Sequence, residues 1–231
     1  MKSKEEHMNC HETEQKETAM KTLSIVAITA FAFLTFANFA PAQDRQKERF
    51  HVSSTTFEDG ATMPSSALYD LQFNGVNVCS LDGSPGGNES PELSWTNAPR
   101  HTASFAVIAF DVTAGFIHWG MYNISPSATG LPENAGVTGS KYGQQVINNF
   151  GSPGNNAFIN YDGPCPPPDY PPNVHHYVFT VYALDKELKL PGSANFPPTG
   201  AALFRVLVEA GECHHILASA SITGLYSTTP E

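Results

Sequence analysis

The sequence predicts a mainly antiparallel β fold with one short helix near the C-terminus. Hydrophobic residues make up 41% of the 231 residues, close to the globular average, so the chain can bury a full core. Only 15% of the residues are charged, while 18 Gly, 18 Pro and frequent Ser, Thr and Asn indicate many turns. Short apolar stretches with alternating side chains lie between these turns, as is typical of strands rather than of a helical bundle.

The first 42 residues are expected to be a targeting segment rather than part of the fold. Residues 23–40 are almost wholly apolar, Lys21 precedes them, and Ala40-Pro41-Ala42 has the small-x-small form of a signal peptidase site. We therefore divide the chain into a polar extension or upstream mis-start (1–19), a cleaved signal peptide (20–42) and one domain (43–231) that is secreted or periplasmic. The alternative is a single membrane anchor, because the apolar stretch is nearly long enough to span a bilayer.

Within the domain, residues 43–56 form a polar lead-in, and residues 57–101 alternate short apolar pieces with turns. The clearest strands are expected at 104–110, 117–124 and 175–184. Strict alternation in the second of these gives two faces, one with Ile117, Trp119, Met121 and Asn123 and the other with His118, Gly120, Tyr122 and Ile124.

After the third strand, the pattern changes from alternation to helical spacing. Residues 200–210 are expected to form one short helix, because four apolar residues recur there at helical intervals: Leu203, Val206, Leu207 and Ala210. Alternation returns over residues 216–222 and predicts a last strand that ends at Thr223-Gly224.

Charge and cysteine content limit the partners and the compartment. A formal net charge of −10 without a Lys/Arg cluster excludes nucleic acid as the main partner, because neutralising phosphates supplies most of that affinity. Three cysteines lie in the domain: Cys79, Cys165 and Cys213. Export predicts one disulfide and one odd thiol, and all three pairings are compatible with the spacing.

The motifs of common hydrolases and nucleotide-binding enzymes are missing: Gly-x-Ser-x-Gly, the phosphate loop, His-Glu-x-x-His and paired Cys-x-x-Cys. The remaining candidates are polar residues at or near the ends of apolar strands: Asp111, His118, His175 and Tyr177. His175 and Tyr177 must face the same side of their strand, and His176 the other. A carboxylate, two imidazoles and a phenol beside the rigid proline cluster suit a phosphate monoester with a nearby amino group.

Two other interpretations stay open at this point. Asp111, His118 and His175 could hold zinc or copper, or form a hydrolytic site, although no Ser or Cys has an obvious base beside it. The pocket could also be vestigial, in a protein with a purely structural or interaction role. The pair His175-His176 offers only one imidazole to a common centre, because adjacent strand residues point in opposite directions.

Several motifs occur in an order that resembles the phosphatidylethanolamine-binding protein family, also called the Raf kinase inhibitor-like family, and especially its bacterial members. The main ones are Ser90-Pro91-Glu92-Leu93-Ser94-Trp95, Phe116-Ile117-His118-Trp119, Asn149-Phe150-Gly151, Tyr161-Asp162-Gly163-Pro164-Cys165-Pro166-Pro167 and His175-His176-Tyr177-Val178-Phe179. The resemblance runs from about Phe57 to Tyr226.

The resemblance implies a β-sandwich with one large antiparallel sheet, a smaller sheet and a short C-terminal helix. It implies a non-enzymatic protein without a cofactor, whose anion pocket takes phosphate-bearing head groups and which meets membranes only through such groups. Inhibition of a kinase or protease is implied as a second role. The implied pocket residues are Asp111, His118, His175 and Tyr177, with Gly163 and Pro164 as a loop wall and Phe116 as an aromatic wall. A disulfide between Cys79 and Cys165 is the pairing that the resemblance favours.

The chain also departs from the family pattern. The loop after Asp111 reads Val112-Thr113-Ala114-Gly115, shorter than usual and without a second carboxylate. His176 stands where the family usually has Arg, and the stretch between Phe57 and Ser90 is longer and richer in Gly.

Overall fold

The computed structural model describes residues 49–169 and 171–230, in which β-strands dominate. The strands are β1 (His51–Ser53), β2 (Gln72–Phe73), β3 (Val76–Asn77), β4 (Leu93–Thr96), β5 (Ser104–Asp111), β6 (Phe116–Ile124), β7 (Gly130–Leu131), β8 (Gln144–Gln145), β9 (His175–Leu184) and β10 (Ile216–Tyr226). The helices of this part of the chain are two 3-10 turns, η1 (Ser65–Ala67) and η2 (Asn156–Phe158), and one α-helix, α2 (Gly200–Glu212). The expected antiparallel β fold with a short C-terminal helix is confirmed.

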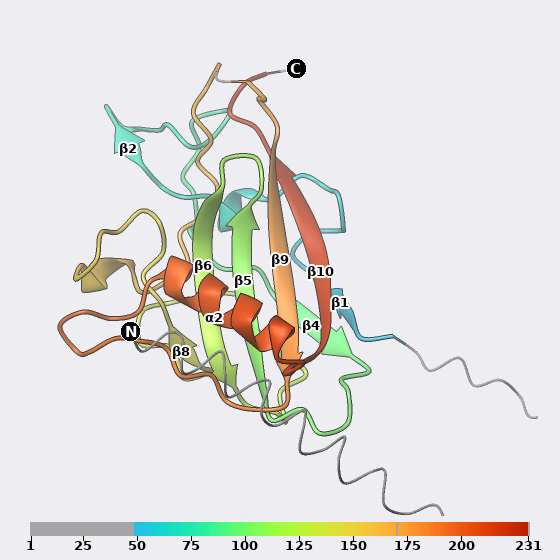
Figure 1. Ribbon diagram of the computed structural model, residues 1–231. Coiled ribbons are helices and arrows are strands. Elements are labelled where there is room, and N and C mark those ends of the chain that lie inside the picture. Colours follow the sequence, from blue (N-terminus) through green and yellow to red (C-terminus); the bar gives the residue numbers. More distant parts are fainter. Residues whose placement is uncertain (1–48, 170, 231) are drawn as a thin grey trace, which may run out of the picture. The chain divides into compact units, whose positions relative to one another are not determined.

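The largest sheet has five antiparallel strands in the order β10-β9-β5-β6-β8 (Figure 1). β5 lies at its centre, and seven of its eight residues are buried. The last residue of β5, Asp111, pairs with Tyr177 on β9 and with Phe116 on β6. Strand register alone therefore brings three of the expected site residues to one end of the sheet.

Each face of the five-stranded sheet is covered by a different layer. One face packs against the three-stranded sheet β1-β4-β7 and nearby loops, in a core cluster that includes Phe105, Val107 and Ala109 of β5. α2 lies across the other face (Figure 1), where Ala106 and Ile108 pack in a second cluster with apolar residues of the helix. The alternation of β5 side chains thus divides the core into two layers.

The expected element boundaries agree closely with the structure. β9 has the expected bounds, and β5 and β6 each extend one residue beyond the prediction. Within the stretch described from the sequence only as a polar lead-in, residues 51–53 form β1, which pairs with β4. β10 does not end at Thr223-Gly224 as expected but continues to Tyr226, since Gly224 still pairs with Tyr177 of β9. Glycine fits at position 224 because the Met63 side chain occupies the space where a Cβ would lie.

The expected alternation of β6 is wrong at two positions. Ile117 pairs with Phe110 but Trp119 pairs with Ala109, so one extra residue, His118, forms a β-bulge. Ile117 consequently packs in the cluster beneath α2, while Trp119 packs in the opposite cluster.

A second irregularity near the end of β6 places Ile124 in the same cluster as Trp119, against the expectation. Strict alternation fails because a bulge opposes two residues to one and shifts every following side chain.

Among the described residues, no helix combines the length and the apolar character that crossing a membrane requires. The extension 1–19 and the signal peptide 20–42 expected from the sequence lie outside these residues.

Candidate functional site

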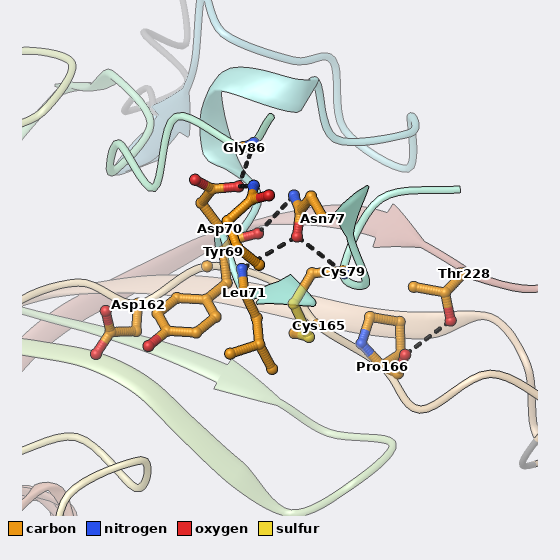
Figure 2. The surroundings of a disulfide bond; sticks show 12 residues. Tyr69, Asp70, Leu71, Asn77, Cys79, Gly86, Asp162, Cys165, Pro166 and Thr228 are labelled. Atoms are coloured by element: carbon orange, nitrogen blue, oxygen red, sulfur yellow. Dashed lines mark hydrogen bonds between the residues drawn. A yellow bond between two sulfur atoms is a disulfide. The ribbon is translucent and has the colours of Figure 1, made fainter. Parts of the chain in front are cut away.

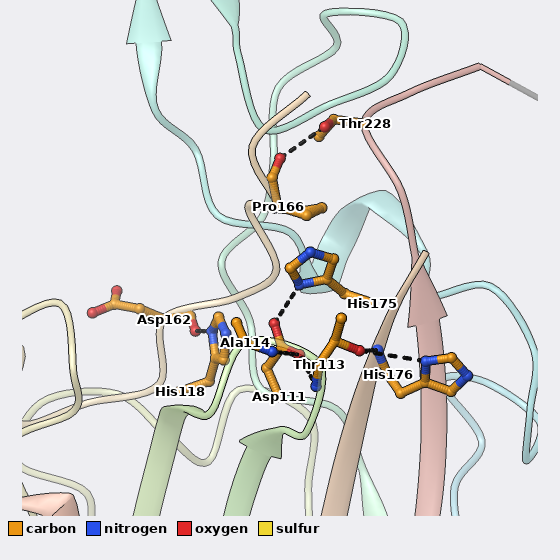
Figure 3. A network of polar contacts seen from close by, with 9 residues as sticks. All are labelled: Asp111, Thr113, Ala114, His118, Asp162, Pro166, His175, His176 and Thr228. Atoms are coloured by element: carbon orange, nitrogen blue, oxygen red, sulfur yellow. Dashed lines mark hydrogen bonds and ion pairs between the residues drawn. The ribbon is translucent and has the colours of Figure 1, made fainter. Parts of the chain in front are cut away.

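A buried carboxylate–imidazole pair forms the centre of the site (Figure 3). Asp111 ends β5 and His175 begins β9, and the antiparallel pairing of these strands brings the two side chains together. The Nδ1 atom of His175 lies 2.6 Å from Oδ2 of Asp111. Oδ1 of Asp111 accepts hydrogen bonds from the main-chain N–H groups of Thr113 (2.9 Å) and Ala114 (3.1 Å) in the short turn that follows. His175 is thereby oriented with Nε2 as the nitrogen left for a ligand.

His118, on the bulge of β6, is fixed by a different acceptor. Its Nδ1 lies 2.7 Å from the main-chain oxygen of Asp162. A carbonyl oxygen only accepts, so Nδ1 carries the hydrogen and the neutral ring has its lone pair on Nε2. Burial lowers the pKa of His118, and this outweighs the opposite effects of the hydrogen bond that His118 donates to Asp162 and of the charges of Asp111 and Asp162.

The ring of Tyr177 lies near both imidazoles. Its ring centroid is 5.1 Å from that of His118, in an edge-on arrangement, and 6.3 Å from that of His175. Burial, and secondarily the charge of Asp111, raises the pKa of the Tyr177 phenol. The phenol therefore stays neutral and contributes a hydroxyl group that can donate a hydrogen bond.

An aromatic wall stands beside His118. The ring centroid of Phe116 is 5.0 Å from that of His118 and 4.8 Å from that of Phe150. Phe150 is also 5.5 Å from His118, and Tyr69 stacks on it at 5.0 Å. Phe116 was expected in this wall, whereas Phe150 and Tyr69 were not among the predicted site residues. Phe150 belongs to the Asn149-Phe150-Gly151 motif, which is the signal that could have identified it.

The carboxylate of Asp162 holds the loop that carries Gly163 and Pro164. Asp162 is buried, and its side chain accepts hydrogen bonds from the carboxamides of Asn88 (2.9 Å), Asn148 (2.7 Å) and Asn160 (2.9 Å). The Oδ1 atom of Asn88 in turn accepts the main-chain N–H of Gly163 at 2.8 Å. We call these four residues the carboxamide cluster. It fixes the main-chain oxygen that orients His118, and the prediction did not include it.

Close backbone packing explains why this loop contains glycine. A Cβ on Gly163 would lie 2.0 Å from the main-chain oxygen of Ala67, where no side chain fits. The main-chain oxygen of Pro164 accepts a hydrogen bond from the N–H of Tyr69 at 3.2 Å. The loop wall is therefore attached to segment 67–69 through its backbone.

A disulfide links the same loop to a second segment (Figure 2). Cys165 is bonded to Cys79, as the resemblance implied, across a sequence separation of 86 residues. The odd thiol expected from the sequence is not observed, because no cysteine within the described residues is free.

The structure thus brings together Asp111, His118, His175, Tyr177 and Phe116, and places the Gly163-Pro164 loop directly after the residue that orients His118. Across residues 49–169 and 171–230, no group of three or more His, Cys, Asp or Glu side chains is arranged to hold a metal ion. The metal interpretation therefore has no ligand set in this part of the chain.

Comparison with known proteins identifies relatives of the chain and of its fold. Residues 53–227 match the family described as phosphatidylethanolamine-binding protein. The UPF0098 protein YbcL of Escherichia coli (strain K12) is 34% identical over 218 residues, which cover 90% of this chain and 98% of that protein. The crystal structure of E. coli YbcL superimposes with a TM-score of 0.59 at 30% identity, covering 78% of this chain and 99% of that one. A putative lipoprotein of Mycobacterium tuberculosis, LppC, is 30% identical over 166 residues, covering 71% of this chain and 67% of that protein.

Proposed function

Because the chain belongs to the phosphatidylethanolamine-binding protein family, we propose that it is a non-enzymatic binding protein for a small anionic ligand. The ligand class is a phosphate monoester or a phosphate-bearing head group, held by Asp111, His118, His175 and Tyr177. Gly163 and Pro164 form the loop wall of the site, and Phe116 forms its aromatic wall.

One observation carries this proposal: both imidazoles are anchored through Nδ1 and are within reach of one neutral phenol. His175 is held by Asp111, and His118 by the main-chain oxygen of Asp162. Each ring keeps its Nε2 for a ligand, and Tyr177 adds a hydroxyl donor. Imidazolium nitrogens and a phenol donate to phosphate oxygens, and the apolar wall around them strengthens such hydrogen bonds.

The same residues supply no obvious nucleophile, which favours binding over hydrolysis. The nearest hydroxyl of the β5–β6 turn, that of Thr113, accepts a hydrogen bond from the main-chain N–H of His176 at 3.1 Å. A hydrolase would need a nucleophile or an activated water, and the sequence shows no Ser or Cys with an obvious base beside it.

Inorganic phosphate and phosphoethanolamine test the proposal in a thermal unfolding assay. A ligand at one hundred times its Kd stabilises the native state by about 2.7 kcal/mol, which corresponds to a rise in Tm of roughly 5–10 °C for a domain of this size. The His118→Asn variant should lose this shift. The His215→Asn variant is the control, because His215 pairs with Asp185 at 3.0 Å outside the site. A shift that persists in His118→Asn, or no shift with either compound at millimolar concentration, would contradict the proposal.

We also propose export of the protein into an oxidising compartment. The Cys79–Cys165 disulfide supports this location, because such bonds persist mainly outside the reducing cytosol. The similarity to the putative lipoprotein LppC supports it as well. N-terminal sequencing of protein recovered outside the cytoplasm tests the expected cleavage after Ala42, and a retained apolar stretch 23–40 would contradict it.

A further inference from the structure

The hairpin formed by β2 and β3 exposes a dense group of apolar side chains. Five large apolar residues in segment 71–81 are exposed to solvent: Leu71, Phe73, Val76, Val78 and Leu81. The same segment contains no charged residue. Isolated exposed apolar residues are common, but a contiguous group of this kind marks an interaction surface.

This hairpin is held in place rather than loosely attached. The buried side chain of Asn77 accepts the main-chain N–H groups of Leu71 (3.1 Å) and Cys79 (3.0 Å) and donates to the main-chain oxygen of Tyr69 (3.1 Å) (Figure 2). The Cys79–Cys165 disulfide fastens its base. A pre-ordered element loses little conformational entropy when it binds, which favours a docking role.

The hairpin lies at the same end of the five-stranded sheet as the candidate site (Figure 1). Tyr69, just before the hairpin, stacks on Phe150, whose ring is 5.5 Å from that of His118. Two further exposed apolar residues occur at this end. Val112 follows Asp111, and Val174 precedes His175.

We propose that the β2–β3 hairpin inserts into the surface of a lipid bilayer whose head groups carry no net charge. The exposed apolar residues of segment 71–81 are aliphatic apart from Phe73, and the segment lacks the Arg, Tyr and Trp that dominate binding energy in protein interfaces. Asp70 and Asp82 flank the hairpin, and no Lys or Arg lies within it, so an anionic surface repels this end. The inference rests on the proposed function in one respect: when the hairpin inserts, the candidate site faces the lipid head groups that it is proposed to bind.

A tryptophan reporter in the full chain tests insertion locally. In the Phe73→Trp variant, emission should shift to shorter wavelength with phosphatidylcholine vesicles and should be quenched by brominated phosphatidylcholine. The native Trp95 and Trp119 are buried and serve as a constant background. The Phe196→Trp variant is a matched control, because Phe196 and Phe73 are both 66% exposed. Its emission should not change.

A charged substitution in the hairpin and a change in lipid charge provide two further tests of insertion. Adding Val76→Asp to the Phe73→Trp variant should reduce vesicle affinity by about tenfold or more, since it places a carboxylate in the apolar region. Replacing a large part of the phosphatidylcholine with phosphatidylglycerol should weaken the response at low salt.

Three results would overturn the assignment. They are an unchanged Phe73→Trp emission, an equal shift in Phe196→Trp, or a concentration-dependent shift without vesicles, which would indicate a second copy of the chain as the partner. Calorimetry with inorganic phosphate separates the two proposals. A Phe73→Trp shift without phosphate binding supports the hairpin inference and contradicts the proposed function. Phosphate binding without the shift does the reverse.

Discussion

Acidification should tighten oxyanion binding through His118, and sulfate is the best probe because it carries no proton of its own near neutral pH. Nδ1 of His118 already donates to the main-chain oxygen of Asp162 at 2.7 Å. A proton taken up by the ring must therefore go to Nε2, and only the imidazolium form can donate from Nε2 to a sulfate oxygen. Each bound sulfate should consequently take up one proton at this residue.

The magnitude follows from this one-proton linkage. Above the pKa of His118, sulfate affinity should fall about tenfold per pH unit, equivalent to about 1.4 kcal/mol. Burial lowers that pKa below its ordinary value of 6.5, although the neighbouring charges of Asp111 and Asp162 favour the protonated ring. Tyr177, which faces the ring from β9, stays neutral because its pKa is raised. The slope should therefore extend from about pH 8 to below about pH 6.5.

Acidification should lower the stability of the ligand-free protein, whereas it should raise the affinity for sulfate. Between the lowered pKa of folded His118 and 6.5, the unfolded chain binds a proton at this residue and the native state does not. The contribution of His118 to stability is therefore complete above pH 6.5 and is lost as the pH falls through this window. Acid thus weakens the empty protein and tightens its sulfate complex.

Calorimetry in two buffers of different protonation enthalpy counts the protons taken up per sulfate, and thermal unfolding with and without sulfate measures both stability effects. In the His118→Asn variant, the proton assigned to His118 should be missing, so the remaining slope should be shallower by about tenfold per pH unit. A wild-type affinity that is independent of pH, or that falls on acidification, would refute the tautomer argument. An equal slope in His118→Asn would refute it as well. Phosphate should show a shallower dependence, because a phosphate O–H can donate to the neutral Nε2.

Three substitutions probe the supports of the site, each by urea unfolding. Asp111→Asn should lower stability by about 1.5–3 kcal/mol and weaken phosphate binding, because it removes the charge from a buried, hydrogen-bonded group. Gly163→Ala should lower stability by about 1–3 kcal/mol or more, since its Cβ would lie 2.0 Å from the main-chain oxygen of Ala67. Cys79→Ser should lower stability by about 4 kcal/mol, because it opens a link across 86 residues to Cys165.

Matched controls exist for two of these substitutions. Asp185→Asn removes a His–Asp pair with His215 that is much more exposed than the pair in the site, and it should change stability by less than about 1 kcal/mol. Gly211→Ala should be neutral or stabilising by up to about 1 kcal/mol, because Gly211 lies in α2 and its Cβ would meet only the Ile216 side chain of β10, at 3.6 Å. If Gly163→Ala were as mild as Gly211→Ala, the close-packing explanation of the loop would be wrong.

The part of the site that depends on local periodicity was predictable from the sequence. Alternation placed His175 and Tyr177 on one face of a strand whose bounds were also predicted correctly, and the end of an apolar stretch marked Asp111 as the last residue of another strand. These features follow from the two-residue repeat of a β-strand, which is a local property, whereas the antiparallel pairing that brings Asp111 to His175 joins residues 64 positions apart.

The remaining features depend on contacts that no local pattern records. The bulge at His118 is a property of the pairing between two strands, so alternation within one strand could not reveal it. The carboxamide cluster unites Asn88, Asn148 and Asn160 around Asp162, although Asn in a sequence usually indicates a turn. Phe150 was missed for the same reason, since it lies in a turn-rich stretch.

Because of the bulge in β6, the candidate site could be lost while the β-sheet that carries it stays the same. Removing one residue there would restore strict alternation and swing the imidazole of His118 toward the helix-covered layer, while the strand order could survive unchanged. A chain of this architecture could therefore retain Asp111, His118, His175 and Tyr177 and no longer bring them together. For sequences aligned to this protein, the residue count between Phe116 and Trp119 is a better indicator of this arrangement than the presence of the histidines.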